Sequence, residues 1–484
     1  MRQAFSTASA PPSAWLAIIS ACQPVGEWSA RSRITVPIPP RVLLGPTWST
    51  VRILPHRIRL TAGKAHEGLA VRLGDGVLIA EPIERGAGFD MVLRVAFLVV
   101  QVVATLTVVI PLAWHAWLNR RWMRLGAPLP PACADADLPF LCVVVPTWNE
   151  AAVIEAKLSD LLAQRYPSNR RRFLLIDSAS TDDTVALATA WDKAHSAGLE
   201  IVTMPARLGK SAAINRVIEE LRSTDEVFVM TDAEALLEAG ALRRIGRWMK
   251  DDSIGAVCGT PGQDADSEAY RDWYRWFREG ESRADSTPIF EGSIAAYRIS
   301  AVQPVEAAAN ADDSQLAVIV RASGLRAISD GAIRFHETPL TDPKERRDRI
   351  VRRGQGLSRH FWRQRSRWFL KDEWGTILGL NGVQHTITPW CVIIGILAGI
   401  AHATTVILLG WSGSEALLLD RVMLLVDALV LASLAIGVAR IRVPLCATIL
   451  AFLEQNLHLA RGMLLFKMGM NLHQWKPSKS NRLR

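Results

Sequence analysis

Two carboxylates, Asp232 and Glu234, stand one residue apart in the stretch FVMTDAEALL (residues 228–237). The apolar residues before them predict a short buried strand that ends where the carboxylates begin. In a sheet of parallel strands, ligands bind beyond the carboxyl ends of the strands. The pair is therefore expected where a bound molecule would meet it.

Three other polar stretches also follow apolar runs that predict strands. PTWNE (146–150) ends one apolar run, and DSASTDDT (177–184) ends the next, so that Asp177 leaves the sheet where a base or ribose would lie. RLGKSAAIN (207–215) supplies two cations and a glycine before a helix, which suits a phosphate. It is not a P-loop, because Met204 replaces the first glycine of G-x-x-x-x-G-K-[ST]. Each stretch alone is more simply a helix cap or a solvated loop, but their joint order indicates a site.

The elements that must position these stretches form an α/β pattern. Apolar runs alternate with amphipathic segments over residues 138–356, and helices are expected at about 150–165 and 211–222. Strands that are buried on both faces and separated by helices specify a parallel sheet with helices on each side. A nucleotide is the commonest ligand of such a sheet.

The series PTWNE, DSASTDDT, GKSAAIN and TDAEA resembles the membrane-bound family 2 glycosyltransferases, the inverting class with the GT-A fold. EGSIAAYR (291–298) is similar to the acceptor-side segment of that family, and NADDSQLA (310–317) to its catalytic-base motif. RRDRIVRRGQG (346–356) resembles its arginine-rich closing segment. The resemblance covers residues 140–356 and implies a GT-A nucleotide-binding domain with a mainly parallel sheet.

The resemblance implies a nucleotide-sugar donor at the strand ends. Asp232 and Glu234 would hold Mg²⁺ or Mn²⁺ against the diphosphate, since hard divalent ions favour oxygen ligands. The metal would neutralise charge on the departing diphosphate. The residues that would bind the donor are Pro146, Glu150, Asp177, Lys210 and Asp232.

The catalytic residues that the resemblance implies are Asp313 and Asp312. Asp313 would deprotonate an acceptor hydroxyl, which then attacks the anomeric carbon from the face opposite the leaving group. The neighbouring Asp312 would raise the pKa of this base through like-charge repulsion. On the acceptor side, the implied residues are Gly292, Arg298, Arg346 and Arg349.

Two departures from the family pattern refine the prediction. Glu234 replaces the second Asp of D-x-D, and the closing segment lacks the Q-x-x-R-W of many polymer-making members. Single sugar transfer is therefore favoured over processive synthesis. We predict a membrane-anchored inverting glycosyltransferase whose acceptor is a polysaccharide or a lipid-linked sugar. The alternative is a non-catalytic nucleotide-binding membrane scaffold of the same fold.

The composition favours a membrane protein. The 484 residues are 49% hydrophobic and carry a net charge of +9, a combination that reflects the positive-inside bias of membrane loops more often than nucleic-acid binding. No nucleic acid is expected as a partner, although binding through the basic segment 1–90 remains a third hypothesis. That segment is predicted to be a disordered arm, a targeting segment, or an extension ahead of a true start at Met91. The six cysteines have no disulfide or metal spacing.

Apolar stretches at both ends predict transmembrane helices. Residues 91–117 can cross ~30 Å of hydrocarbon, and the arginines that follow place that end in the cytoplasm. Residues 387–470 are expected to contain two spans, 387–411 and 417–438, and a last interfacial or re-entrant helix. Residues 357–380 predict an amphipathic helix on the membrane surface, with a nucleic-acid patch as the competing interpretation. The expected location is the inner cell membrane, multi-pass, with lipid as a partner and the catalytic domain in the cytoplasm.

Overall fold

The computed structural model describes residues 58–59, 70–73, 76–79, 87–262, 269–337, 342–409, 418–439 and 443–472. The chain divides into two compact units, Met1–Asp90 and Met91–Arg484. In the first unit, the described residues form an antiparallel sheet of β1 (Ile58–Arg59), β2 (Ala70–Leu73) and β3 (Gly76–Ile79), which the sequence did not predict. Residues 1–57 lie outside the described part of the chain.

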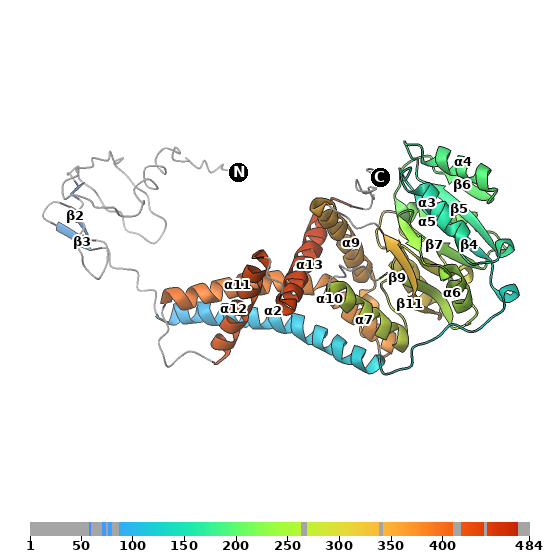
Figure 1. Ribbon diagram of the computed structural model, residues 1–484. Helices are drawn as coiled ribbons and strands as arrows, with labels where there is room; N and C mark the ends of the chain where they lie inside the picture. Colours follow the sequence, from blue (N-terminus) through green and yellow to red (C-terminus); the bar gives the residue numbers. More distant parts are fainter. Residues whose placement is uncertain are drawn as a thin grey trace, which may run out of the picture. The chain divides into compact units, whose positions relative to one another are not determined.

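The second unit contains an eight-stranded sheet in the order β6-β5-β4-β7-β10-β9-β11-β8 (Figure 1). Four neighbours are parallel: β4 (Leu141–Thr147), β5 (Arg171–Asp177), β6 (Leu199–Thr203) and β7 (Val227–Met230). β10 (Ala295–Arg298) is antiparallel to both β7 and β9 (Ile254–Pro261). β11 (Arg326–Glu337) is parallel to β9 and antiparallel to β8 (Ala235–Leu237). The prediction of a mainly parallel sheet in an α/β domain is confirmed.

Helices cover both faces of this sheet because successive residues of a strand point to opposite sides. Val143 and Val145 of β4 enter one hydrophobic core, whereas Cys142 and Val144 enter the other. The first core is completed by α3 (Ile154–Ala163), α4 (Thr184–His195) and α6 (Ala241–Trp248), and the second by α5 (Lys210–Glu220) and α8 (Asp312–Ala322). These layers hold the carboxyl ends of the strands in fixed positions.

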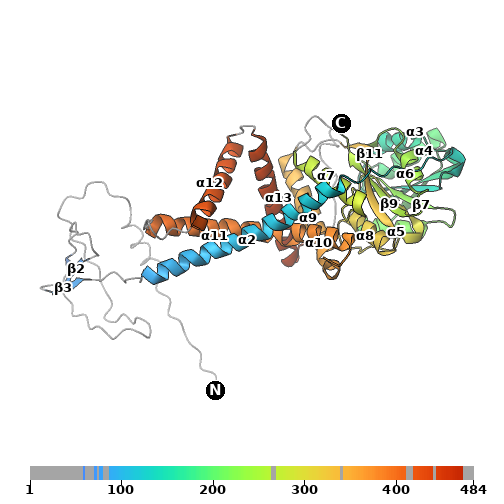
Figure 2. The ribbon, with the colours of Figure 1, turned by 90° about the horizontal axis from the view of Figure 1, so that it is seen from below.

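Long helices make up the rest of the second unit (Figures 1 and 2). They are α2 (Ala87–Trp122), α7 (Ala269–Ala284), α9 (Pro343–Arg363), α10 (Glu373–Thr386), α11 (Thr388–Leu409), α12 (Leu418–Val438) and α13 (Pro444–Lys467). Among the described residues, two stretches are long and apolar enough to cross a membrane by length and composition, Met91–Trp122 and Thr388–Leu408. They correspond to the first predicted span and to the first of the two C-terminal ones.

The acids of α12 face neighbouring helices. Asp420 Oδ2 lies 2.6 Å from Arg94 Nη2 of α2, and Asp420 Oδ1 lies 3.0 Å from His402 Nε2 of α11. One heptad further on, Gln101 Nε2 donates to Asp427 Oδ1 at 2.8 Å. These contacts tie α12 to α2 and α11 through polar groups.

Residues 357–380 do not form the single surface helix that the sequence suggested. α9 ends at Arg363, and α10 begins only at Glu373, after a short turn at Arg365–Arg367. Phe361 is fully buried where α9 packs against α10 and α13. The break forms because Trp368 and Phe369 fold back onto glycines of α10, where an added Cβ would lie 2.2 Å and 2.9 Å from their rings.

Candidate active site

The first part of the site lies where β4 and β5 end. The backbone turns at Asn149, whose φ of 56° is in the left-handed region that asparagine tolerates. Asn149 N donates to Ser180 Oγ at 2.8 Å, and Thr181 N donates to Asn149 Oδ1 at 2.7 Å. Asp182 accepts a further bond from Ala151 N at 3.2 Å. The PTWNE and DSASTDDT loops are therefore bound to each other, beside a cavity of about 310 Å³ lined by Asn149, Ala151, Ala152 and Asp182.

Three predicted donor residues lie in or beside these loops. Asp177 is buried and accepts from Ser180 Oγ at 2.5 Å and from Ser180 N at 2.9 Å. Glu150 is also buried, and its backbone N–H donates to Thr184 Oγ1 at 2.8 Å. Pro146 is the buried penultimate residue of β4. In this structure the hydrogen bonds of Asp177 shape the loop, so its side chain supports the cavity wall.

A lysine and a carboxylate meet at the next strand end. α5 begins at Lys210, after Gly209 with a φ of 94°, and Lys210 Nζ donates to Asp232 Oδ1 at 2.5 Å. Burial alone would lower the pKa of Lys210, but the carboxylates of Asp232, Asp312 and Asp313 raise it above its ordinary value. The lysine therefore remains a cation in the site, as phosphate binding requires.

The second carboxylate of the D-A-E stretch has a different partner. Glu234 Oε1 lies 2.7 Å from Arg349 Nη2 of α9, and Arg349 Nη1 lies 3.4 Å from Glu337 Oε2 at the end of β11. Burial raises the pKa of Glu337, and Glu234 adds to the increase. One arginine is thus shared between two carboxylates at the junction of β8, β11 and α9.

Asp312 and Asp313 open helix α8. Burial and the adjacent Asp312 together raise the pKa of Asp313 to about 7, although Lys210 opposes them. A Cβ atom at Gly292 would lie 3.0 Å from Asp313 Oδ2 and 3.0 Å from Lys210 Nζ. The absence of a Cβ at Gly292 thus lets the carboxylate and the ammonium group approach the same point without displacement.

Helix α9 brings in residues that the sequence interpretation did not single out. Burial, assisted by the neighbouring arginines, lowers the pKa of Arg352 to about 10. Burial would also lower the pKa of Arg353, but the carboxylates of Glu291 and Glu337 raise it. Arg349, Arg352 and Arg353 are spaced three and four residues apart and share one face of a helix. That spacing was the available signal in RRDRIVRRGQG.

The structure places two of the predicted acceptor-side residues, Arg298 and Arg346, differently from Arg349. Arg298 lies at the opposite edge of the sheet, paired with Val227 at the start of β7, and donates to Met249 O at 2.9 Å and Ile254 O at 3.1 Å. It therefore holds the turn before β9. Arg346 is exposed in α9, three residues before Arg349.

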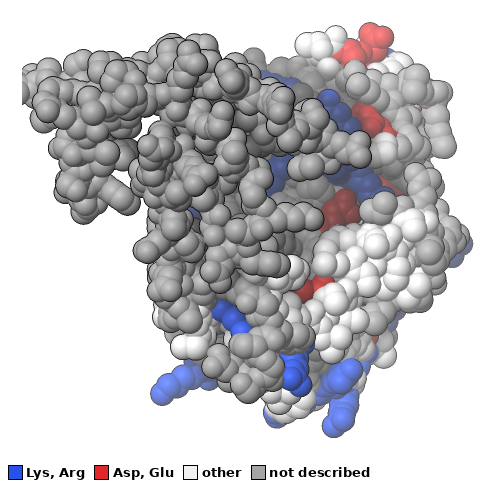
Figure 3. Space-filling model, turned by 90° about the vertical axis from the view of Figure 1, so that its left-hand side faces the viewer, with Lys and Arg blue, Asp and Glu red and all other residues white. Residues whose placement is uncertain are grey.

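The donor set suits a hard divalent cation that also binds a diphosphate. Within the described parts of the chain, no cluster of three or more His, Cys, Asp or Glu side chains could hold a metal alone. Asp232 and Glu234 provide two partly exposed carboxylates, and Mg²⁺ is commonly bound by one or two carboxylates plus substrate phosphates. The remaining ligands would thus come from the donor. On the face shown in Figure 3, acidic and basic side chains lie next to one another among the described residues.

Comparison with known proteins identifies the class of this domain. Residues 142–305 match the family described as Glycosyl transferase family 2. The structure is similar to that of mannosyltransferase PcManGT from Pyrobaculum calidifontis, solved in complex with GDP-Man and Mn²⁺. The TM-score is 0.62 and the sequence identity 27%, over 77% of this chain and 99% of that chain.

Curated relatives match over shorter stretches. Glycosyltransferase AglE of Haloferax volcanii is 35% identical over 85 residues, and beta-monoglucosyldiacylglycerol synthase of Nostoc sp. is 30% identical over 129 residues. These alignments cover 18% and 25% of this chain. The chain spans only 28% and 26% of the length of these two relatives.

Proposed function

Because this chain contains a family 2 glycosyltransferase domain with the GT-A fold, we propose that it transfers a sugar from a nucleotide-sugar donor to a glycan or lipid-linked acceptor, with inversion at the anomeric carbon. The observation that carries the proposal is the meeting of three groups at one edge of the sheet. Lys210 contacts Asp232, and the side chains of Lys210 and Asp313 both approach Gly292. A cation, a metal-type carboxylate and a base of raised pKa are what sugar transfer from a diphosphate needs.

The donor would occupy the carboxyl edge of the sheet. Its base and ribose fit the cavity beside Asn149 and Asp182, where Asp177 and Glu150 support the walls. Its diphosphate would lie between Lys210 and the α9 arginines Arg352 and Arg353. The similar mannosyltransferase was solved in complex with GDP-Man, a donor of this chemical class.

Asp313 is proposed as the base. With a pKa near 7, it is ionised in a substantial fraction of molecules at neutral pH and still basic enough to accept a proton from a hydroxyl. The acceptor oxygen would lose this proton to a carboxylate oxygen of Asp313 as it bonds to the anomeric carbon. The bond from that carbon to the diphosphate oxygen breaks on the opposite face, which inverts the configuration.

The ion pairs of the D-A-E stretch would change when the donor binds. In this structure Asp232 is paired with Lys210, and Glu234 with Arg349. A bound Mg²⁺ or Mn²⁺ would take these carboxylates as ligands and neutralise charge on the leaving diphosphate. Lys210 and Arg349 would then be free to contact phosphate oxygens instead.

The acceptor and the location are proposed from the long apolar helices. Met91–Trp122 and Thr388–Leu408 are long and apolar enough to anchor the chain in the inner cell membrane, and the arginines that follow the first favour a cytoplasmic catalytic domain. One relative is named for synthesis of a glucosyl-diacylglycerol, which supports a lipid-linked acceptor close to the bilayer. Residues 346–356 lack Q-x-x-R-W, but Gln364–Trp368 read QRSRW and match it, so the sequence expectation of single transfer is withdrawn.

The direct test is a transfer assay with the purified full chain in lipid nanodiscs. A panel of nucleotide sugars is offered with Mn²⁺ and a glycolipid extract, and products are identified by mass spectrometry. At least one donor should be consumed and should yield a glycosylated product, and chelation of the metal should stop the reaction. If the panel yields neither transfer nor hydrolysis, the chain is the non-catalytic scaffold.

A variant of Glu234 tests the carboxylate pair. Glu234→Asp shortens the side chain by one methylene, so it should reach the metal less well and also lose its contact with Arg349. We expect a loss of about tenfold in rate and a higher metal concentration for half-maximal activity. If metal dependence and rate are both unchanged, Glu234 is not a metal ligand.

A further inference from the structure

The loop before the proposed base is held from three sides. Asn310 Nδ2 donates to Leu472 O at 3.0 Å and to Arg352 O at 3.3 Å. One residue earlier, Ala309 O accepts from Ser211 Oγ at 2.5 Å. The loop therefore contacts the helix that carries Lys210, the helix that carries Arg352, and the chain that follows α13.

That last contact is made by residues 470–472, which we name the C-terminal segment. Gln355 of α9 is fully buried, and its Nε2 donates to Met470 O at 3.0 Å and to Gly462 O at 3.1 Å. Its Oε1 accepts from Leu472 N at 2.8 Å. One side-chain amide thus fixes the segment to both α9 and α13, and sets which carbonyl group is presented to Asn310.

A second set of bonds reinforces this arrangement. Asn471 Nδ2 donates to Ala308 O at 2.8 Å, and Arg359 Nη1 donates to the same carbonyl at 3.1 Å. Arg359 Nη1 also lies 3.1 Å from Asn471 Oδ1. The C-terminal segment therefore binds the loop at two points, Ala308 and Asn310.

The packing around these bonds leaves no room for adjustment. A Cβ atom at Gly356 would lie 2.5 Å from Asn310 Cβ, and one at Gly462 would lie 2.8 Å from Val351 O. Between Asn310 and the base, Ala311 has a φ of 60°, a left-handed conformation that is unfavourable for alanine. Such a conformation persists where its surroundings hold it, and here the anchors of Asn310 do so.

We propose that Asn310 and Gln355 are positioning residues, through which the C-terminal segment sets the position of Asp313 relative to Lys210 and the α9 arginines. This inference rests on the proposed function, in which Asp313 is the base. Misplacement of a reacting group by about 1 Å can cost on the order of 100-fold in rate. Loss of the anchor should therefore lower kcat and leave donor binding intact.

The first experiment compares two isosteric variants in the full chain. Asn310→Asp removes both donated bonds and keeps the side-chain volume. The matched control is Asn215→Asp, because Asn215 is also half-buried and pins the same loop at Val305, with Nδ2 donating to Val305 O at 2.8 Å. We expect Asn310→Asp to lower kcat by 10- to 100-fold with the KM for the donor within about twofold, and Asn215→Asp to change kcat by less than about threefold. Asn310→Ala, which adds no charge, should behave like Asn310→Asp.

The second experiment shortens the chain at two positions. A chain that ends at Leu472 keeps the C-terminal segment, whereas one that ends at Gly469 lacks it. The shorter chain should show the kcat loss of Asn310→Asp, and adding Asn310→Asp to it should cause little further loss, since both changes remove the bond from Asn310 Nδ2 to Leu472 O. Melting temperature and donor binding are measured in parallel to identify chains that have lost their fold.

The outcomes separate this inference from the proposed function. If the wild type transfers sugar from none of the donors, the proposed function fails. If it does transfer sugar and Asp313→Asn retains full activity, the base is misassigned and the positioning inference is overturned with it. If Asp313→Asn is inactive while Asn310→Asp and both shortened chains keep the kcat of the wild type, only the positioning role is overturned. Equal losses in the Asn310 and Asn215 variants would also overturn it, because they would reflect general loosening of the loop.

Discussion

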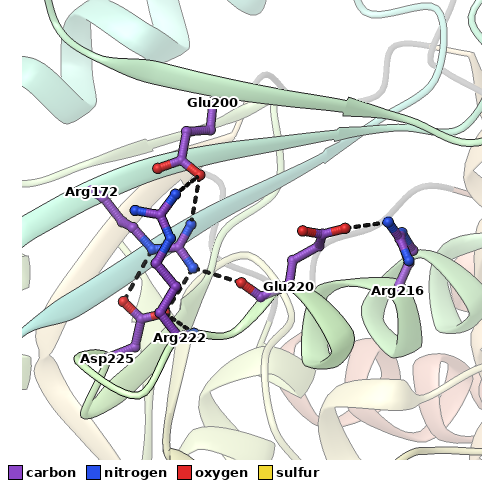
Figure 4. Close-up of polar contacts among 6 residues, drawn as sticks. All are labelled: Arg172, Glu200, Arg216, Glu220, Arg222 and Asp225. Atoms are coloured by element: carbon purple, nitrogen blue, oxygen red, sulfur yellow. Dashed lines mark hydrogen bonds and ion pairs between the residues drawn. The ribbon is translucent and has the colours of Figure 1, made fainter.

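Two groups of charged side chains occupy opposite edges of the eight-stranded sheet. At the amino ends of the strands, Arg172 of β5 donates to Asp225 through Nε at 3.0 Å and through Nη2 at 2.7 Å (Figure 4). It also donates to Glu200 of β6 at 3.1 Å, and Arg222 donates to the same glutamate at 2.7 Å. We call these four residues the amino-edge cluster. Its charges are paired in a geometry that needs no ligand.

The carboxyl edge contains the same residue types in a different balance. There Asp312 and Asp313 are adjacent, Lys210 is shared among three carboxylates, and Arg352 lies among other arginines. Burial, with the like charge of Asp312 beside it, raises the pKa of Asp313 to about 7, and burial among like charges lowers the pKa of Arg352 to about 10. Charges that are crowded in this way cost stability and suit a site that binds a charged ligand and transfers a proton. The balance of positive and negative charges, rather than the presence of charge, therefore distinguishes the amino-edge cluster from the site.

The largest effect is expected when Asp313, the proposed base, is changed. Asp313→Asn should lower kcat by roughly 1000-fold, because the amide cannot accept the proton of the acceptor hydroxyl. The fold should not suffer. Burial raises the pKa of Asp313 in the folded state, so ionised Asp313 disfavours the fold above pH 7, and the variant should melt at a higher temperature there. At pH 4, where the carboxyl is protonated, this gain should vanish.

The amino-edge cluster should show the opposite pattern. Asp225→Ala leaves Arg172 buried without its bidentate partner, which should lower the free energy of unfolding by about 3 kcal/mol. The kcat of the molecules that remain folded should match the wild type. Thermal melting in detergent and activity per folded molecule measure the two quantities. A large fall in kcat would mean that this edge also takes part in function.

The pH dependence of the rate sharpens the contrast further. Asp313 must be deprotonated to act, so the rate at saturating substrate should rise about tenfold per pH unit below 7 and level off above it. Asp312→Asn removes the like charge beside the base and should move the inflection to lower pH. An inflection that does not move would show that Asp312 has no influence on the base.

The smallest effect is expected at the exposed end of α5. Arg216 contacts Glu219 and Glu220 one turn away; the side chains of Arg216 and Glu219 are exposed, and that of Glu220 is partly exposed. Figure 4 shows the contact of Arg216 with Glu220. Such pairs contribute little because water screens them and holding long side chains costs entropy. Arg216→Ala should change the melting temperature by less than about 1 °C and leave the kinetics intact. A clear shift in either would show that exposure is a poor guide to the importance of these charges.

The sequence predicted those features of the site that depend on strand direction. Asp177, Lys210 and Asp232 follow parallel strands, and the carboxyl ends of parallel strands share one edge of a sheet. Arg298 shows the limit of this reasoning. It ends β10, which runs antiparallel to β7, so that its position at the end of a strand places it at the opposite edge. Direction cannot be inferred from a four-residue run of apolar residues.

The ion-pair partner of each charged residue could not be predicted from the local sequence either. Glu234 and Arg349 are 115 residues apart in the chain, and their contact depends on how α9 packs beside β8. The break within residues 357–380 depends on glycines of α10 that receive Trp368 and Phe369. Aromatic residues among many arginines favoured one continuous surface helix, because this composition contains no information about which aromatic side chains fold back.

By itself, the sequence determined the α/β class and the edge on which the D-A-E carboxylates lie, and its resemblance to family 2 glycosyltransferases implied the proposed base. The first two follow from local patterns whose physical meaning does not depend on distant residues. Only the tertiary structure decided that Lys210 and Arg349 neutralise those carboxylates, that Arg298 serves another edge, and that residues 470–472 reach the loop of Asp313. Each of these is a contact between segments far apart in the chain, and such contacts are set by the packing of whole helices against the sheet.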